Sequence, residues 1–387
     1  MTRRELLAAA VSGAAALSGA RVATGSAATG RTRRYEYVLP DGAIHVFDRD
    51  RGFAFVRKID LPQTARGTRG VCGSALTGML YVSYGGIGGD FGNGAMLRFD
   101  LLKSTVVWAR NYPFGIDSMS ISPDGRWVYM PDGSQSKDGI VRVLDARTGA
   151  VAAKIQAASG PHNTLLSRDG RRLYIGCEYW DYLLVADTKT RRVVKSIGRF
   201  VDGIRPFTIN GTETLAFVNC TGFLGFQVAS ITTGRVLYTV PFAGLSYDPK
   251  TYFPTAPSHG ISLSPDERTL YAVDAPNAFV HVFDVRGVPQ SAPKLVARIK
   301  LSSFAEEETG CAYSCLKDGW LSQTRDGRYL FVGDAGDVID TKTRKVATHL
   351  EPLANTRKFI EVQFDARGRV AWVAPFRMSV GQVTRRP

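Results

Sequence analysis

The sequence predicts an all-β fold, arranged as a ring of seven units of four strands each. Two kinds of half-repeat recur along the chain, seven times each, and the two series are out of phase at the chain ends. The composition agrees, because 40 glycines, 18 prolines, 20 Phe and 15 Tyr suit a protein built of strands and tight turns. Together these observations predict a seven-bladed β-propeller with antiparallel blades.

The first half-repeat is an apolar strand, a tight turn and a second strand that contains an aromatic residue. Clear copies are "SMSISPDGRWVYMP" and "HGISLSPDERTLYAV". The turn residues favour chain reversal, because Pro fixes φ and Gly accepts a positive φ. The seven copies cover residues 70–83, 118–131, 162–176, 205–219, 259–273, 319–333 and 360–374.

The second half-repeat is a third strand, in most copies ending in Asp, followed by a turn and a fourth strand, as in "DVIDTKTRKVATHL". Its copies begin at Ala43, Ala95, Val141, Leu183, Phe226, Val280 and Asp337. The N-terminus therefore supplies an orphan second half and the C-terminus an orphan first half. A linear array would leave two unpaired sheet edges, whereas in a ring the N-terminal strands complete the last blade. We expect one domain over residues 35–387, closed in this way.

The repeats resemble those of a known family. The segments "SPDGRWVYM", "SPDERTLYAVD", "VLDARTGAVAAKI" and "VIDTKTRKVATHL" are similar to YVTN-type repeats. This seven-bladed group includes lactonase-like propellers and the methylamine dehydrogenase heavy chain. The resemblance covers nearly all of the chain after residue 35 and implies the propeller fold. It does not imply one function, because the same fold hosts enzymes and binding proteins.

The N-terminal segment predicts export. Residues 1–28 contain the pair Arg3 and Arg4, then an apolar run, then small residues up to Ala28, which is the layout of a cleaved Tat-type signal. Residues 29–34 are expected to be a linker. No segment has 18 continuous apolar residues, so a membrane span is not predicted. The expected location is extracytoplasmic, either secreted or periplasmic.

The net charge favours anionic partners. The chain has 49 Lys and Arg against 35 Asp and Glu, a formal charge of +14. A basic exported protein suits acidic polysaccharides, cell-wall polymers or small carboxylates, although solvated surface charge explains such a composition equally well. No basic run interleaved with aromatic residues indicates nucleic-acid binding. We expect a monomer with a small-molecule or anionic glycan ligand.

Aligning the first half-repeats on the turn glycine identifies the residues at the mouth of the channel. In blades two to five these residues are Asp117, His162, Arg205 and His259. The other three positions are Gly70, Gly319 and Ile360, and their neighbours are Arg69, Asp318, Lys358 and Glu361. Of the other histidines, His45 and His281 share the motif "HVFD" and are predicted to be structural, and His349 falls on an outer strand.

Long inserted loops are predicted on the same face of the ring. They cover residues 84–94, 242–258 and 302–318, and the short loop 177–182 joins them. Polar groups surrounded by aromatic rings are typical of a small-ligand or sugar site. For any single aromatic residue, bracing of a long loop is the better explanation. The predicted substrate-binding residues are Asp117, Arg69, Trp320, Lys358, Tyr179, Trp180 and Tyr252.

The residue types at the mouth suit proton transfer beside an anion. Imidazole exchanges a proton near neutral pH, and a guanidinium binds a carboxylate through two hydrogen bonds. We therefore predict His162 and His259 as acid/base residues and Arg205 as an anion clamp in a lyase or hydrolase for acidic sugars or lactones. The alternatives are a non-catalytic propeller that binds an envelope polymer or a protein, and an electron-transfer or amine-oxidising subunit.

The cofactor is left open by the sequence, although a divalent metal is an alternative use of the same residues. His162 and His259 would have to meet on the axis, with Asp117 as a third ligand. The loop "DGSQSKD" at residues 132–138 could hold calcium, but it lacks a closing Glu and is better explained as a solvated loop. The five cysteines are Cys72, Cys177, Cys220, Cys311 and Cys315. Cys177 and Cys220 could bridge adjacent blades or remain thiols, and "CAYSC" could form a local disulfide.

Overall fold

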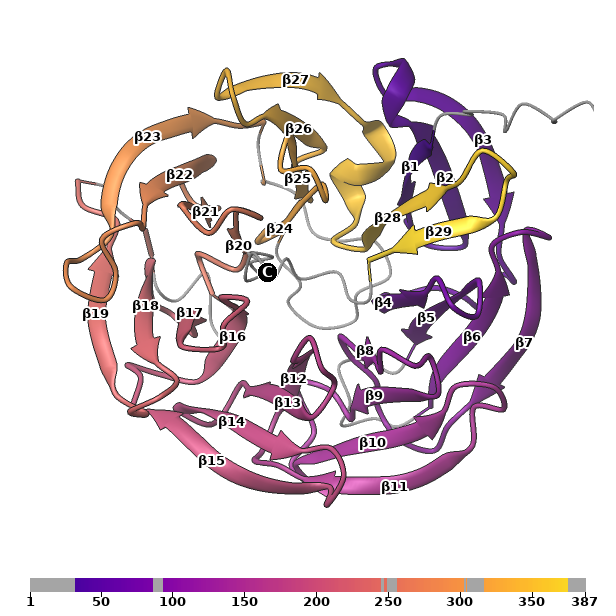
Figure 1. Ribbon diagram of the computed structural model, residues 1–387, viewed down its shortest axis with the longest axis horizontal. Helices are drawn as coiled ribbons and strands as arrows, with labels where there is room; N and C mark the ends of the chain where they lie inside the picture. Colours follow the sequence, from indigo (N-terminus) through magenta and orange to yellow (C-terminus); the bar gives the residue numbers. More distant parts are fainter. Residues whose placement is uncertain are drawn as a thin grey trace, which may run out of the picture.

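Seven β-sheets surround a central axis in a computed structural model of the chain (Figure 1). The structure describes residues 32–85, 93–244, 247–248, 256–302, 304 and 317–374. The predicted export signal at residues 1–28 lies outside them. No helix in these ranges is long and apolar enough to cross a membrane. The seven-bladed β-propeller predicted from the repeats is confirmed.

Six blades are four-stranded antiparallel sheets that follow one another along the chain. Blades 1 and 2 contain β4 (Thr68–Ser74), β5 (Met79–Gly85), β6 (Gly94–Asp100), β7 (Thr105–Asn111), β8 (Ser120–Ile121), β9 (Trp127–Pro131), β10 (Ile140–Asp145) and β11 (Val151–Gln156). Blades 3 and 4 contain β12 (Pro161–Leu166), β13 (Arg172–Cys177), β14 (Tyr182–Asp187), β15 (Arg192–Gly198), β16 (Ile204–Ile209), β17 (Leu215–Cys220), β18 (Gly225–Ser230) and β19 (Val236–Pro241). Blades 5 and 6 contain β20 (Ile261–Leu263), β21 (Thr269–Asp274), β22 (Phe279–Asp284), β23 (Lys294–Lys300), β24 (Trp320–Gln323), β25 (Tyr329–Gly333), β26 (Asp337–Asp340) and β27 (Lys345–His349).

The seventh blade joins the two ends of the chain, but not in the predicted pairing. Its strands are β1 (Arg33–Val38), β2 (Ala43–Asp48), β3 (Ala54–Asp60), β28 (Phe359–Phe364) and β29 (Val370–Val373). Their order is β29-β28-β1-β2-β3, so β1 rather than β29 lies between β28 and β2. The N-terminal segment thus supplies three strands and β29 becomes a fifth. β1 begins two residues before the boundary predicted for the propeller.

A buried ion network holds this closure together. Arg49, in the short 3₁₀ helix η1 (Arg49–Arg51), pairs with Glu361 on β28 and lies 3.1 Å from Asp326 of blade 6. Arg34 on β1 contacts Asp326 at 2.8 Å. Since Arg49 and Glu361 are both nearly fully buried, each needs the other to compensate its charge. Another 3₁₀ helix, η3 (Glu351–Asn355), leads into β28.

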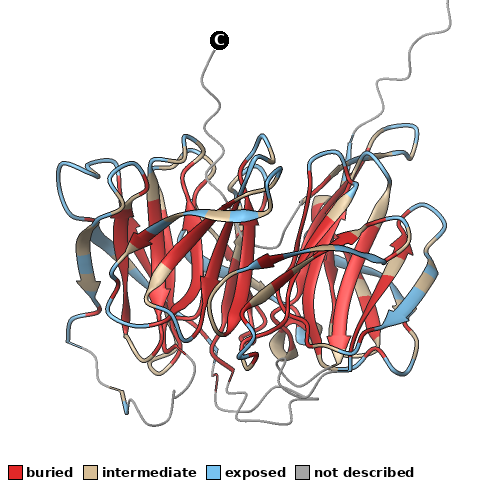
Figure 2. Cartoon of the chain, turned by 90° about the horizontal axis from the view of Figure 1, so that it is seen from below, coloured by how far each residue is buried: buried red, intermediate tan, exposed pale blue. Residues whose placement is uncertain are grey.

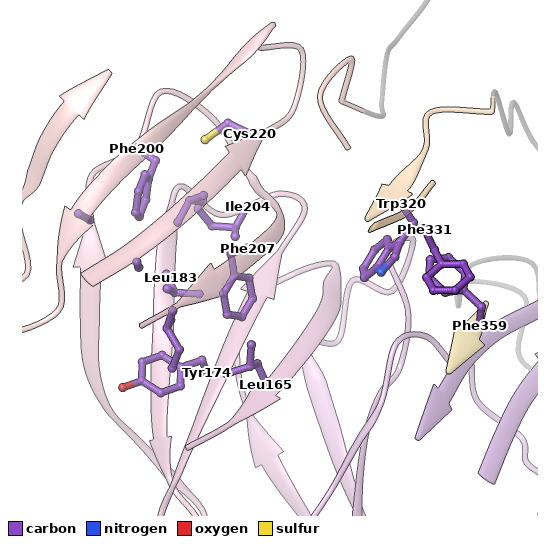
Figure 3. Close-up of a cluster of buried hydrophobic side chains, with 14 of the residues drawn as sticks. Leu165, Tyr174, Leu183, Phe200, Ile204, Phe207, Cys220, Trp320, Phe331 and Phe359 are labelled. Carbon is purple, nitrogen blue, oxygen red and sulfur yellow. The ribbon is translucent and has the colours of Figure 1, made fainter. Parts of the chain in front are cut away.

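The core lies between neighbouring blades and not within them. Figure 2 shows buried residues filling the inner strands, whereas exposed residues occupy turns and outer strands. All six residues of β12 are buried, while β15 at the rim alternates in exposure. Figure 3 shows Leu165 and Tyr174 of blade 3 packed near Phe207 of blade 4. Each fully buried side chain of this size contributes roughly 1.5–3 kcal/mol, which holds the blades in register.

The repeated turn has a local physical cause. In blade 2 the Ser122 hydroxyl accepts a hydrogen bond from Trp127 N at 2.9 Å, and Gly125 adopts φ +70°. Ser167 and Ser264 repeat the contact in blades 3 and 5. A side-chain oxygen that satisfies a backbone N–H favours the turn over a longer strand. The turns fix where each innermost strand ends, and the channel-mouth residues lie at the other end of that strand.

Candidate functional site

Three residues at the channel mouth project from β-bulges. The register of β12 with β13 shifts at His162, that of β16 with β17 shifts next to Arg205, and that of β4 with β5 shifts at Arg69. A bulge leaves one residue out of the ladder and turns its side chain away from the normal alternation. The bulges therefore free these side chains from the packing between blades.

The structure brings together His162 of blade 3 and His259, which precedes β20 of blade 5. Their Nε2 atoms lie 3.4 Å apart and their ring centroids 5.6 Å apart. Both side chains are buried, with 8% and 2% exposed. The two residues were predicted to face one another around the axis, and in the structure their rings are in direct contact.

Each imidazole is held from behind through its Nδ1 atom. His162 Nδ1 lies 2.9 Å from Asp117 Oδ2, and His259 Nδ1 lies 3.1 Å from the Gly319 carbonyl oxygen. Asp117 is placed by the link between blades 2 and 3, where Ser118 and Asn163 form a parallel bridge. We call His162 and His259, so anchored, the histidine pair.

The anchors determine where the protons lie in the histidine pair. A carboxylate and a carbonyl oxygen only accept hydrogen bonds, so both Nδ1 atoms carry hydrogen. Two neutral rings would then direct the Nε2 lone pairs of His162 and His259 at each other. A hydrogen bond at 3.4 Å requires one additional proton, shared between the two Nε2 atoms. This assignment follows from the hydrogen-bond network.

The surroundings of the two rings favour this proton on His162 over His259. Burial lowers the pKa of His259 well below its usual range, and the positive charges of Arg357, His162 and Arg205 lower it further. His162 contacts the Asp117 carboxylate at 2.9 Å, closer than the 3.4 Å between His259 and Asp318, and a nearby carboxylate stabilises an imidazolium. Of the two rings, His259 is thus the one held neutral, and His162 is the one whose contact with a carboxylate favours a positive charge.

Behind His259 lies a second group of charges that the sequence did not fully predict. Asp318 Oδ1 is 3.4 Å from His259 Nδ1 and also pairs with Arg357, whose Nε lies 3.4 Å from Asp334 Oδ2. Trp320 is fully buried, with its ring centroid 5.6 Å from that of His259. These contacts fix the His259 ring in blade 5 against blade 6.

Glu178 is a site residue that the sequence reasoning missed. It follows β13, is buried, and its Oε2 lies 2.9 Å from a terminal nitrogen of Arg205. Burial raises the pKa of Glu178 to about 7, Arg205 lowers it and Asp117 raises it. The one sequence feature that could have identified Glu178 is its acidic side chain in the loop at residues 177–182. Glu178 follows the second strand of its blade, so an alignment of the residues at the start of the first strands did not include it.

The remaining predicted residues separate into three groups. Arg69 and Lys358 are buried next to the channel-mouth positions, and the Arg69 carbonyl accepts a hydrogen bond from Ser118 Oγ at 3.4 Å. Tyr179 and Trp180 are 46% and 45% exposed, so the structure leaves them on the rim and outside the buried cluster. Tyr252 lies outside the described residues.

The geometry changes the ligand set considered for a metal. Asp117 contacts Nδ1 of His162, so it orients that ring and does not join the two Nε2 atoms as a third ligand. Within the described ranges no group of three or more His, Cys, Asp or Glu side chains could hold a metal ion. The two Nε2 atoms of the histidine pair are the donors that a metal would meet here.

Cys177 and Cys220 do not link their blades. Cys177 and Cys220 are free and buried, and burial raises the pKa of each thiol to about 12. Of the two alternatives left open by the sequence, the structure supports free thiols. Cys311 and Cys315 lie outside the described part of the chain.

Two of the other histidines fit the repeat structure. His281 is fully buried, lies 3.1 Å from Asp274 Oδ2 and stacks on Phe242 at 4.1 Å between centroids. His45 packs against Phe55 on the outer part of the closing blade. Neither reaches the histidine pair.

Fold and site together define a seven-bladed β-propeller with a buried polar cluster at one end of its channel. No protein-family model and no curated protein matches the chain. One similar solved structure is Kuenenia stuttgartiensis hydrazine synthase, with 16% identity over 80% of this chain and 87% of that chain, at a TM-score of 0.53. Another is the dihydro-heme d1 dehydrogenase NirN in complex with DHE, with 16% identity over 89% of this chain and 73% of that chain, at a TM-score of 0.55. At this identity the likeness shows a shared propeller fold, and membership of the YVTN group stays a prediction.

Proposed function

We propose that this protein is an exported enzyme that acts on an anionic carbohydrate or a lactone at the channel mouth. The observation that carries the proposal is the histidine pair, with Nε2 atoms 3.4 Å apart and both Nδ1 atoms anchored. Two imidazoles that share one proton provide an acid and a base at the same place.

The roles of the two rings follow from their surroundings. In an elimination, neutral His259 would take the proton beside the substrate carboxylate, and protonated His162 would give one to the departing oxygen. In lactone hydrolysis, the same groups would serve the attacking water and the ring oxygen. Arg205 would hold the negative charge of the substrate or of the developing enolate.

A substrate panel tests the proposal. Oligosaccharides that contain uronates, and a set of lactones, are incubated with the wild type and with His162→Ala and His259→Ala. We expect each variant to lose about 10²-fold or more in kcat/KM, since general acid–base catalysis contributes 10²–10⁴-fold. His349→Ala, on the half-exposed outer strand β27, is the matched control and should keep its rate.

Two results would count against the proposal. If the wild type is active and both histidine variants keep full rate, the assignment of the pair is wrong. If the wild type turns over none of the panel but binds anionic wall polymer in a salt-sensitive way, indifferent to the histidines, a non-catalytic binding propeller is the better account. The net charge of +14 would suit that alternative.

The proposed location rests on the first 28 residues. Expression in a bacterial host with and without a functional Tat system, followed by fractionation, checks it. We expect the processed protein outside the cytoplasm only where the Tat system works.

A further inference from the structure

The partner of Arg205 in this structure is itself a carboxylate. Glu178 Oε2 lies 2.9 Å from the Arg205 guanidinium, and both side chains are nearly fully buried. If Arg205 is the anion clamp proposed above, Glu178 lies against the group that the substrate carboxylate has to reach.

The backbone holds Glu178 firmly in this place. Its N–H donates to the Gly160 carbonyl oxygen at 2.7 Å, which ties the loop to the start of β12. On the other side, a Cβ at Gly203 would overlap the Glu178 carbonyl oxygen, so the turn before β16 packs directly against it. Since the loop is fixed from both sides, the backbone of Glu178 keeps its carboxylate close to Arg205.

Protonation of Glu178 would free Arg205 without any movement of the backbone. The charged groups that face Glu178 are Arg205 from the start of β16 and Asp117 from the segment before β8. Arg205 favours the carboxylate, whereas burial and Asp117 favour the protonated acid. A second carboxylate placed on Arg205 would add negative charge beside Glu178 and favour protonation further.

We propose that Glu178 is an internal competitor for the anion position on Arg205, and that a carboxylate ligand binds there with uptake of one proton by Glu178. The inference rests on the proposed role of Arg205. The proton comes from solvent and ends on a Glu178 oxygen, and no bond of the ligand breaks in this step. The expected ligand is a monocarboxylate, because its single carboxylate takes the place of the Glu178 carboxylate on Arg205.

Calorimetry with D-glucuronate tests the coupling. Binding to the wild type is measured about one pH unit above the pKa of Glu178, where that group is mostly ionised, in phosphate, HEPES and Tris, whose ionisation enthalpies differ. We expect uptake approaching one proton per ligand, and an affinity that falls about tenfold per pH unit above the pKa of Glu178. D-glucose, which has no carboxylate, should show no proton uptake.

The Glu178→Gln variant tests whether Glu178, and not another titrating group, takes up the proton. This variant should bind D-glucuronate more tightly than the wild type at alkaline pH, with no proton uptake and a flat pH dependence. Glu351→Gln removes the same charge from a fully solvated position and should behave like the wild type. Should Glu178→Gln fail to fold, because Arg205 is left uncompensated, the buffer dependence of the wild type still decides.

The failures of the two proposals can be told apart. Binding of D-glucuronate to the wild type without proton uptake overturns the role of Glu178, even if the enzyme turns over. Failure of D-glucuronate to bind either the wild type or Glu178→Gln overturns the anion position on Arg205, and with it this inference. Proton-coupled binding without turnover of any substrate supports the inference and counts against catalysis.

Discussion

Nε2 of His162 lies 3.4 Å from Nε2 of His259, although 97 positions separate the two residues in the chain. One whole blade, which carries Arg205, lies between their blades in the ring. The contact therefore depends on the bulge at His162 and on a closed ring, since neither blade alone could form it. This relationship links the stability of the closure to the chemistry of the site.

Replacement of Asp117 by Asn should impair acid catalysis without removing either histidine. The carboxylate on His162 Nδ1 stabilises the protonated ring, and an amide does not. We expect kcat/KM to fall by about 10²-fold, in the range of general acid–base effects. The alkaline limb of the pH–rate profile should move to lower pH. Asp284→Asn, at the end of β22, is the control. An equal loss of activity in that variant would contradict the role of Asp117.

Arg49→Met should weaken the closure of the ring. Arg49 and Glu361 are 2% and 4% exposed, so the substitution leaves a buried carboxylate without its cation. Loss of one partner from a buried pair costs about 3–5 kcal/mol. Urea unfolding should show this loss, and most of it should return in Arg49→Met/Glu361→Gln. A single variant as stable as the double variant would contradict the closure role.

Glu36→Gln should change how stability depends on pH. Glu36 faces Glu361 across β1 and β28, and burial together with the Glu361 charge raises its pKa well above 4.5. A raised pKa means that this group stabilises the fold fully below pH 4.5 and loses that contribution as the pH rises through its folded pKa. The variant should therefore gain free energy of unfolding over the wild type with increasing pH. Unfolding at several pH values checks this, and a constant difference would oppose it.

Gly203→Ala should disturb Glu178 through its backbone. A Cβ there meets the Glu178 carbonyl carbon and oxygen, and neither can yield like a flexible side chain. We expect a loss of about 1–3 kcal/mol from overpacking, together with reduced activity. Gly222→Ala is a useful comparison, because its Cβ would meet nothing within 4 Å and only its φ of +64° is strained. It should lose stability but keep the site intact.

The fold was predictable because the ring repeats itself. Each copy of the turn solves the same local problem, with Ser, Thr, Asn or Asp at its start and Gly or Glu in the positive-φ position, so the copies reinforce one interpretation. The closure was predicted only in outline, since residues 360–374 match a first half-repeat and β1 matches nothing else in the chain. Tyr35 and Tyr37 pack β1 into the core between β28 and β4, and that packing decides the strand order.

The site was predictable where the repeat alignment reached and not beyond it. His162, Arg205 and His259 occupy equivalent positions, so one alignment selected all three. Glu178 belongs to a connecting loop, and Arg357 lies outside the aligned positions, so neither could be ranked by the repeat. The roles of Tyr179 and Trp180 were predicted from their residue type and their loop, and neither feature shows whether a side chain is exposed at the rim or buried in the site.

Nitrogen NMR of histidine-labelled protein tests the central claim most directly. The account predicts that both Nδ1 atoms of the histidine pair carry hydrogen at neutral pH, and that one additional proton lies between Nε2 of His162 and Nε2 of His259. His162→Ala should remove that proton and leave His259 neutral. Two independent neutral rings with hydrogen on Nε2, or two rings that each gain a proton separately, would contradict it.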